Sequence, residues 1–172
     1  MRKGRIIVNT GEGKGKTTAA LGAALRAAGH GHRVAIVQFI KGSWSTGEAR
    51  ALKHLPNIKV TRIGSGFTWL AEDPEEPRKL ARQAWEAAKE FGYSDCYELL
   101  ILDELSCALT EGYVSTNEVL EFLRNKPERL SVIITGRGAP PELIEAADTV
   151  TEMRCVKHAY YEGEPARKGI EY

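Results

Sequence analysis

Residues 6–18, IIVNTGEGKGKTT, combine the residue types that hold phosphate groups on a polypeptide backbone. An apolar run is followed by three glycines at alternate positions, the last of which begins Gly15-Lys16-Thr17. Glycines let backbone N–H groups crowd around phosphate oxygens, the start of a helix adds a positive dipole end, and lysine adds a point charge. The threonine hydroxyl can hold Mg²⁺. The stretch therefore predicts a nucleoside triphosphate site.

One position departs from the usual phosphate-binding pattern, which is Gly, four residues, and then Gly-Lys-Ser/Thr. The position of its first glycine is occupied by Thr10 in this chain. A glycine-rich turn before a helix can also be a turn without a ligand. The combination of strand, glycines, Gly-Lys-Thr and helix favours the phosphate-binding interpretation.

A second candidate for chemistry is the apolar run LLIL at residues 99–102, which ends in Asp103 and Glu104. In proteins with a phosphate-binding loop, a carboxylate at the end of such a strand reaches the Mg²⁺ held by the loop threonine. The alternative is an acidic pair that caps the following helix or turn. We expect at least one of the two to bind the metal beside Thr17, and both remain candidates. The same pair would suit an ordinary ATPase in which the glutamate activates water.

The glycine-rich segment GSGFTW at residues 64–69 carries two aromatic residues, Phe67 and Trp69. Loop residues at the carboxyl end of a strand often carry function. One interpretation is a loop that packs on the protein's own core, and the other is a contact with a planar or macrocyclic ligand. The local pattern favours neither.

Two other strands are expected to end in a basic residue beside a glycine. Lys41 follows VQFI and Arg137 follows IITG. Each is a candidate contact for phosphate, or for a carboxylate or amide of a substrate, and each is equally suited to be a solvated charge at the rim. The four histidines have no metal-ligand spacing, so none is assigned to a metal.

The elements that must position these residues alternate between apolar runs and helical patterns. This alternation predicts an α/β fold with a mostly parallel sheet flanked by helices. Near-continuous Val, Ile and Leu runs predict strands that are covered on both faces. Ligands of such sheets bind outside the carboxyl ends of the strands, where the candidate residues lie. The expected strands are residues 5–9, 33–40, 58–63, 98–103, 130–135 and 149–153.

Four helices are expected around this sheet. The first is alanine-rich and ends at Gly29, a candidate left-handed cap. The second begins at Asp73, which can cap it, and ends at Gly92. Trp85 falls on the apolar face of the second helix, so we expect it in the core rather than in the site. The other helices are expected to be shorter; by residues, the four are 15–28, 73–91, 116–124 and 141–147.

Length and composition limit the class of protein. The 172 residues contain no repeat, low-complexity tract or linker, so we expect a single domain over residues 1–172. The net charge of +1 is scattered along the chain, which argues against nucleic-acid or membrane-surface binding. No apolar stretch is long enough to span a bilayer, and the charged N-terminus leaves no room for a signal peptide. Three distant cysteines fit neither a disulfide framework nor a zinc site. We expect a soluble cytoplasmic protein.

Eight segments in order carry a family resemblance: TGEGKGKTTAALGAALRAAGHG, VAIVQFIKG, GFTW, LILDEL, VIITGRG, ADTVTEMR, VKHA and GIEY. They resemble the P-loop ATP:corrinoid adenosyltransferases, also called cob(I)yrinic acid a,c-diamide adenosyltransferases. The resemblance implies a RecA-like P-loop fold and a homodimer. It also implies transfer of the 5′-deoxyadenosyl group of ATP to the Co(I) of a corrinoid, with release of triphosphate, in adenosylcobalamin biosynthesis or salvage. Mg²⁺ is the implied cofactor, and a flavoprotein is the implied reductant.

The resemblance also implies roles for individual residues. Lys16, the loop amides and Mg²⁺ are expected to stabilise the charge that builds on the α-phosphate oxygen as the C–O bond breaks. For the metal, Glu104 together with Thr17 is the first choice and Asp103 the second. The candidate nucleotide contacts are Thr10, Gly11, Glu12, Gly13, Lys14, Gly15, Lys16, Thr17, Thr18, Lys41 and Arg137.

For the corrinoid, the resemblance implies that Phe67 and Trp69 occupy its lower face and displace the axial ligand of Co(II). Loss of that ligand raises the reduction potential, so that a cellular donor can make Co(I). Apolar rings cannot coordinate cobalt, and their burial against the macrocycle helps to offset the lost ligand.

Three functions are compatible with these residues. The leading one is the adenosyltransferase, the second is a plain P-loop ATPase or kinase, and the third is a non-catalytic nucleotide switch. The products separate the first two, because a transferase releases triphosphate whereas an ATPase releases ADP and phosphate. Turnover that depends on a corrinoid separates the first from the third. An ATPase has no use for Phe67 and Trp69.

Overall fold

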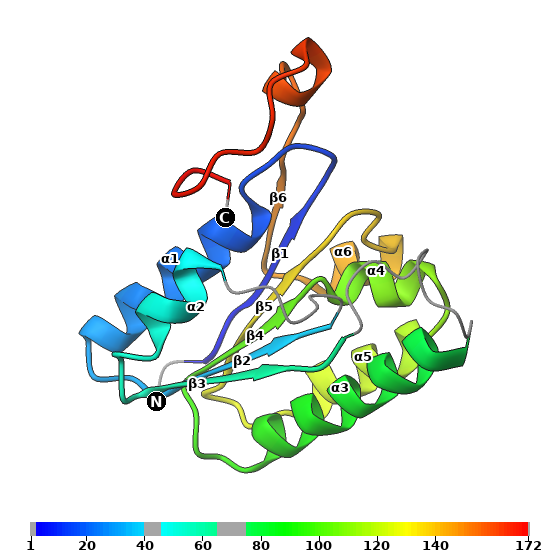
Figure 1. Ribbon diagram of the computed structural model, residues 1–172. Helices are drawn as coiled ribbons and strands as arrows, with labels where there is room; N and C mark the ends of the chain where they lie inside the picture. Colours follow the sequence, from blue (N-terminus) through cyan, green and yellow to red (C-terminus); the bar gives the residue numbers. More distant parts are fainter. Residues whose placement is uncertain (1–2, 40–45, 65–74, 172) are drawn as a thin grey trace.

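The computed structural model of the chain describes residues 3–39, 46–64 and 75–171. Six strands form one sheet in the order β3-β2-β4-β5-β1-β6, and every neighbouring pair is parallel (Figure 1). The predicted α/β fold with a parallel sheet is confirmed, and so are the six predicted strands, with small differences at their ends. The strands are β1 (Ile6–Thr10), β2 (Val34–Gln38), β3 (Ile58–Arg62), β4 (Leu99–Asp103), β5 (Ser131–Thr135) and β6 (Thr149–Glu152).

Helices cover both faces of the sheet (Figure 1). One face packs against α1 (Lys16–Gly29) and α2 (Gly47–Leu52). The other packs against α3 (Glu75–Tyr93), α4 (Leu105–Thr110), α5 (Thr116–Asn125) and α6 (Pro141–Ala146). A short 3₁₀ helix, η2 (Ala159–Glu162), follows β6. None of the helices in the described ranges is long and apolar enough to cross a membrane.

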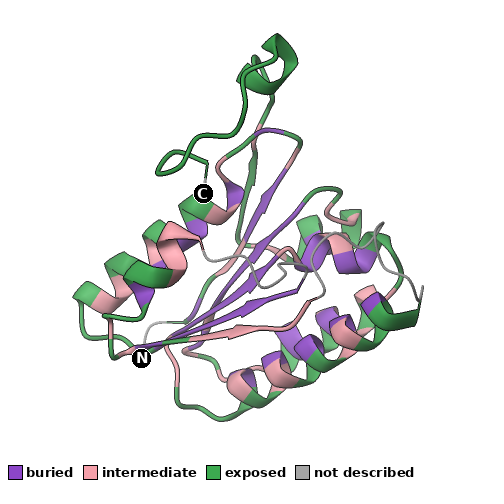
Figure 2. Cartoon of the chain, viewed as in Figure 1, coloured by how far each residue is buried: buried purple, intermediate pink, exposed green. Residues whose placement is uncertain are grey.

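The two cores follow from the alternation of side chains along the strands. In β4, Leu99 and Ile101 join the cluster under α1, whereas Leu100 and Leu102 join the cluster under α3. All residues of β2 and β4 are buried, as expected of strands covered on both faces (Figure 2). Coverage of both faces was also predicted for β6, and this is wrong. All its residues are exposed, because β6 lies at the edge of the sheet beyond β1.

Several helix predictions need correction. Gly29 is the last residue of α1 rather than its left-handed cap, and the left-handed residue is Gly31, with a φ of 77°. Gly92 does not end α3, because the helix continues to Tyr93 and Gly92 is buried within it. The expected cap at Asp73 lies outside the described residues. Helices α2 and α4 were not predicted. Like α6, each has six residues, too few to show a helical period, but only α6 has a proline at its start to mark it. Trp85 is fully buried, which confirms it as a core residue.

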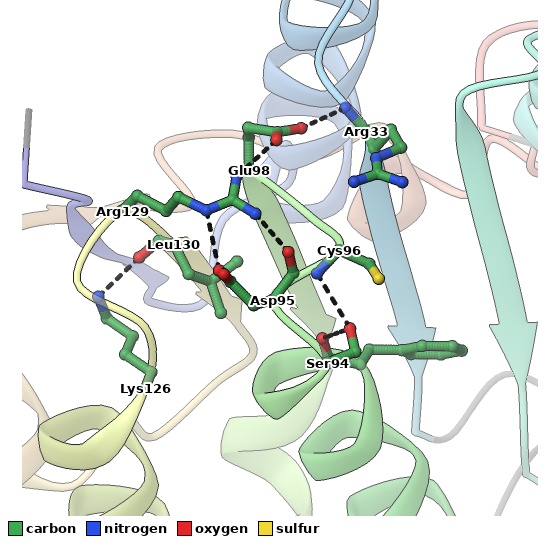
Figure 3. Close-up of polar contacts among 9 residues, drawn as sticks. Arg33, Ser94, Asp95, Cys96, Glu98, Lys126, Arg129 and Leu130 are labelled. Carbon is green, nitrogen blue, oxygen red and sulfur yellow. Dashed lines mark hydrogen bonds and ion pairs between the residues drawn. The ribbon is translucent and has the colours of Figure 1, made fainter. Parts of the chain in front are cut away.

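A cluster of charged groups joins the amino ends of β2 and β4 (Figure 3). The guanidinium of Arg129 donates from Nε to Asp95 Oδ1 at 2.8 Å and from Nη1 to Glu98 Oε1 at 2.6 Å. The backbone N–H of Arg33 donates to Glu98 Oε2 at 2.7 Å. Burial alone would raise the pKa of Glu98, but the bonds from Arg33 and Arg129 outweigh burial and hold that pKa below its ordinary value. Glu98 is therefore an ionised link between the two strands.

The position of Gly92 gives a test of the packing under α3. A Cβ atom at Gly92 would lie 2.3 Å from Cζ of Phe122. The Phe122 ring is buried and stands edge-to-face to both Trp85 and Tyr93, so it has little room to move. We expect Gly92→Ala to lower the free energy of unfolding by about 1–3 kcal/mol, the usual cost of overpacking. Urea denaturation measures the change.

The matched control is Gly22→Ala, at an exposed position of α1 where a Cβ atom would have nothing within 4 Å. Alanine is the better helix residue there, so we expect a gain of about 0.5–1 kcal/mol. If Gly92→Ala instead raised the free energy of unfolding by the same amount, the Phe122 ring could not lie as close to position 92 as described.

Candidate functional site

The loop between β1 and α1, residues 11–15, is called here the glycine-rich loop. Gly11 and Gly15 have φ values of 92° and 108°, which favour glycine, and Gly15 is the N-cap of α1. A Cβ atom at Gly13 would lie 2.6 Å from the carbonyl oxygen of Arg154, so only glycine allows this approach to the chain after β6. The first amides of α1 follow directly, which gives the loop the positive end of a helix dipole.

Lys16 turns back over the glycine-rich loop. Its Nζ atom donates to the carbonyl oxygens of Gly11 at 2.6 Å and Gly13 at 2.7 Å. The residue is only 7 % exposed, so its charge is poorly screened by water. A buried ammonium at the start of a helix is well suited to attract an anion.

Asp103, at the end of β4, is fully buried and accepts hydrogen bonds from three different elements. Its Oδ1 accepts from Thr17 Oγ1 and from Thr135 Oγ1, each at 2.8 Å. Its Oδ2 accepts from Gln38 Nε2 at 2.8 Å. These donors hold the carboxylate in one orientation and fix the first turn of α1 against β4 and β5.

These contacts follow from the register of the sheet. Gln38 of β2 lies opposite Asp103 of β4 on one side and opposite Arg62 of β3 on the other. Arg62 Nε donates to Gln38 Oε1 at 2.7 Å. We call Arg62, Gln38, Asp103 and Thr135 the polar row. It runs across the carboxyl ends of the strands from β3 to β5.

Glu104 follows Asp103 with a left-handed backbone, at a φ of 65°, which is uncommon for a residue other than glycine. Its backbone N–H donates to Thr135 Oγ1 at 2.9 Å, so it is tied to the polar row. Its carboxylate accepts from Cys107 Sγ at 3.0 Å. Burial, and then the charge of Glu104, raise the pKa of the Cys107 thiol to about 12. The thiol therefore stays protonated and remains a donor to Glu104.

A cavity of about 540 Å³ opens beside the glycine-rich loop. One part of its wall consists of residues 12–18, Glu104 and Arg137, all of which are predicted site residues. The other part comes from residues after β6, namely Cys155, His158, Tyr160 and Tyr161. The structure thus brings the predicted loop, one predicted carboxylate and one predicted arginine together around one space.

The other predicted site residues lie in different places relative to the cavity. Arg137 is exposed, and its Nη1 lies 3.3 Å from Oε2 of Glu12. Thr10 does not line the cavity; its Oγ1 accepts from the backbone N–H of Ala139 at 3.2 Å and so links the loop to the segment that carries Arg137. Lys41, Phe67 and Trp69 lie outside the described residues.

Sequence reasoning missed Gln38 and the four cavity residues after β6. A signal existed for the latter, since the rule that ligands bind beyond the carboxyl ends of parallel strands also applies to β6. For Gln38 the signal was weaker. It is a polar residue in an otherwise apolar strand, and only the register of the sheet shows that it faces Asp103.

The donor set suits a hard cation such as Mg²⁺. Because the Thr17 hydroxyl donates its hydrogen bond to Asp103, its oxygen lone pairs are left for a ligand. The Glu104 carboxylate lines the same cavity. In the described ranges no three His, Cys, Asp or Glu side chains are grouped so that they could hold a metal by themselves. Mg²⁺ usually needs only one or two carboxylates, since water and substrate phosphates supply its other ligands.

Comparison with known proteins gives a consistent result over nearly the whole chain. The chain is 43% identical over 171 residues to the corrinoid adenosyltransferase of Pseudomonas aeruginosa, covering 99% of this chain and 84% of that protein. It is 44% identical over 170 residues to that of Escherichia coli K12, with 99% and 86% covered. It is 42% identical over 170 residues to the corrinoid adenosyltransferase CobA of Salmonella typhimurium, again with 99% and 86% covered.

Residues 2–172 also match the family described as ATP:corrinoid adenosyltransferase BtuR/CobO/CobP. A match of this extent covers the glycine-rich loop, the polar row and the residues after β6 alike. The chain belongs to the ATP:corrinoid adenosyltransferase family.

Proposed function

We propose that this protein transfers the 5′-deoxyadenosyl group of ATP to the Co(I) of a corrinoid, cobalamin or cobyrinic acid a,c-diamide, and releases triphosphate. The observation that carries the proposal is the family match over residues 2–172. The cavity beside the glycine-rich loop supports it, since the buried Lys16 ammonium and the start of α1 suit a triphosphate. We further propose that residues 1–172 form a single P-loop domain.

The chemistry explains what Lys16 contributes. In the transfer, a cobalt–carbon bond forms at C5′ while the bond from C5′ to the α-phosphate oxygen breaks, so negative charge grows on that oxygen. The ammonium of Lys16 is held at hydrogen-bond distance from two loop carbonyls, and phosphate oxygens of the leaving group can replace these contacts. Because Lys16 is poorly solvated, its stabilisation of the growing charge is strong.

Mg²⁺ is the proposed cofactor, held by Thr17 with Glu104 as first choice and Asp103 as second. When bound, it supplies further positive charge to the phosphate oxygens. Glu104 lines the cavity, which supports a direct contact, whereas Asp103 is buried and accepts bonds from three side chains. On this proposal Asp103 positions Thr17, and Glu104 contacts the metal.

For the corrinoid, Phe67 and Trp69 are proposed to displace the axial ligand of Co(II). The two residues themselves lie outside the described part of the chain, so the support comes from the family resemblance. They follow β3 in sequence, and because the strands are parallel, the carboxyl ends of β3 and β1 lie on the same side of the sheet. Lys41 is proposed as a further nucleotide contact on the same basis.

The proposed assembly is a cytoplasmic homodimer with a flavoprotein as electron donor. Family resemblance carries these proposals. The exposed edge strand β6, and the exposed apolar side chains of Val156 and Ile170 after it, offer a surface of the kind that a second copy covers. The three cysteines are free thiols, as is usual in a reducing compartment.

The activity is tested without oxygen, by mixing the protein with Mg-ATP and a chemically reduced Co(I) corrinoid. We expect the spectrum of a light-sensitive alkylcorrinoid, formed with one equivalent of triphosphate. ADP without a spectral change would assign the chain to the ATPases instead.

Lys16→Ala, assayed at saturating ATP, is expected to lower turnover about 10²–10³-fold, as does the loss of other groups that stabilise a growing oxyanion.

The metal assignment is tested by titrating Mg²⁺ at fixed ATP with Glu104→Gln and Asp103→Asn. We expect Asp103→Asn to raise the half-saturating Mg²⁺ concentration about 10–100-fold, the usual effect of losing a group that orients a ligand. Glu104→Gln should raise it further, because a direct contact is lost. The reverse order would make Asp103 the direct ligand. Glu90→Gln, an exposed carboxylate on α3, is the control and should not change the titration.

The role of the two aromatic residues is tested with Phe67→Ala combined with Trp69→Ala. We expect this variant to lose activity on Co(II) substrate with a biological reductant, because the axial ligand stays bound. It should keep much of its activity on pre-reduced Co(I), which needs no such step. An equal loss on both substrates would rule out the proposed role.

A further inference from the structure

The chain after β6 forms a segment, residues 153–171, that we call the C-terminal arm. In Figure 1 it extends beyond β6 in orange and red and then folds back toward the start of α1. At its beginning, the N–H of Gly13 donates to the carbonyl oxygen of Met153 at 2.6 Å, and the N–H of Met153 donates to that of Thr10 at 2.8 Å. At its end, Lys14 Nζ lies 3.3 Å from Oε1 of Glu171. Both ends of the arm therefore contact the glycine-rich loop or the strand before it.

Between these anchors the arm carries three rings in mutual contact. His158, Tyr160 and Tyr161 stand edge-to-face to one another, with ring centroids 5.9 to 6.5 Å apart. Tyr160 is 74% exposed and Tyr161 is 79% exposed, yet all three residues line the cavity beside the glycine-rich loop. Exposed aromatic side chains gathered at the wall of a cavity are typical of a ligand surface.

We propose that these three rings bind the nucleoside part of ATP, while the glycine-rich loop binds its triphosphate. This inference rests on the proposed function. ATP needs two different environments, since its phosphates require cations and N–H groups whereas its purine base offers flat faces that stack on aromatic rings. The loop provides the first environment and the arm provides the second, in one cavity of about 540 Å³.

His158 adds a polar contact to this surface. Its Nδ1 accepts from the backbone N–H of Tyr160 at 3.1 Å, so the neutral ring carries its proton on Nε2. That N–H is a donor, and the ring nitrogens of a purine and the ribose hydroxyls are acceptors. A donor beside stacking surfaces is the combination that orients a base as well as holding it.

A corrin macrocycle also has a flat apolar face and is the alternative ligand for the rings. Two observations favour the nucleoside. The rings share the cavity with the glycine-rich loop, and its volume is in the range of pockets that hold one small ligand. In addition, the anchors at Met153 and Glu171 tie the rings to the loop that would hold the triphosphate, and in ATP the nucleoside is covalently joined to that group.

The test compares the binding of Mg-ATP with that of Mg-tripolyphosphate, which lacks the nucleoside, by calorimetry. For Tyr160→Ala combined with Tyr161→Ala we expect ATP affinity to fall about 5- to 100-fold, the usual effect of losing stacking on a base. Tripolyphosphate affinity should stay unchanged. The control is Glu164→Gln combined with Lys168→Gln, two exposed arm residues of opposite charge outside the cavity wall, which should change neither affinity.

Three results would overturn the proposal. Equal losses for ATP and tripolyphosphate would mean that the arm only supports the loop, and no loss for either would mean that the rings do not contact the nucleotide. A raised KM for the corrinoid with unchanged ATP affinity would assign the rings to the macrocycle. The binding measurement needs no turnover, so failure of this proposal is distinguishable from failure of the wild-type protein to form an alkylcorrinoid.

Discussion

The buried carboxylate of Asp103 is the constraint on which the rest of the site depends. A fully buried polar or charged group is tolerated only where donors surround it. The donors here are Thr17 at the start of α1, Gln38 at the end of β2 and Thr135 at the end of β5. Because three elements must meet at one side chain, satisfying Asp103 also fixes where α1 begins. The position of Lys16 over the glycine-rich loop follows from that.

The hydrogen bonds of Asp103 also require a fixed register between β2 and β4. Gln38 meets Asp103 only while β2 and β4 keep their register, and a shift by one residue would turn Gln38 to the opposite face. An apolar side chain would then lie against the carboxylate. At the amino ends of the same two strands, Glu98 accepts from the backbone of Arg33 (Figure 3). A structural contact at the amino ends of these strands thus helps to hold the geometry of the site at their carboxyl ends.

The sequence predicted what local patterns determine. The buried strands were found because β2, β4 and β5 are apolar runs, and the glycine-rich loop was found because its residue types are fixed by backbone geometry. The motifs predicted a strand-end carboxylate beside Thr17. They did not predict the direct hydrogen bond from Thr17 to Asp103, 86 positions away, or the part of Gln38, which depends on strand register. Helices α2 and α4 are too short to show a period, and they lack the initial proline that marks the equally short α6. For β6, the polar residues of TVTE were a signal of an exposed edge strand.

The order of the strands explains why the cavity has walls from both ends of the chain. β1 and β6 pair in parallel with Thr10 opposite Glu152, so the glycine-rich loop and the C-terminal arm leave the sheet side by side. Residues near position 12 and near position 160 therefore face one space, although nearly the whole chain lies between them. The residues proposed to contact the corrinoid follow β3, at the opposite edge of the sheet. Asp103 lies on β4 between these edges, and the polar row connects it to Arg62 at the end of β3. A change at the end of β3 therefore has a direct physical route, through Gln38, to the carboxylate that positions Thr17.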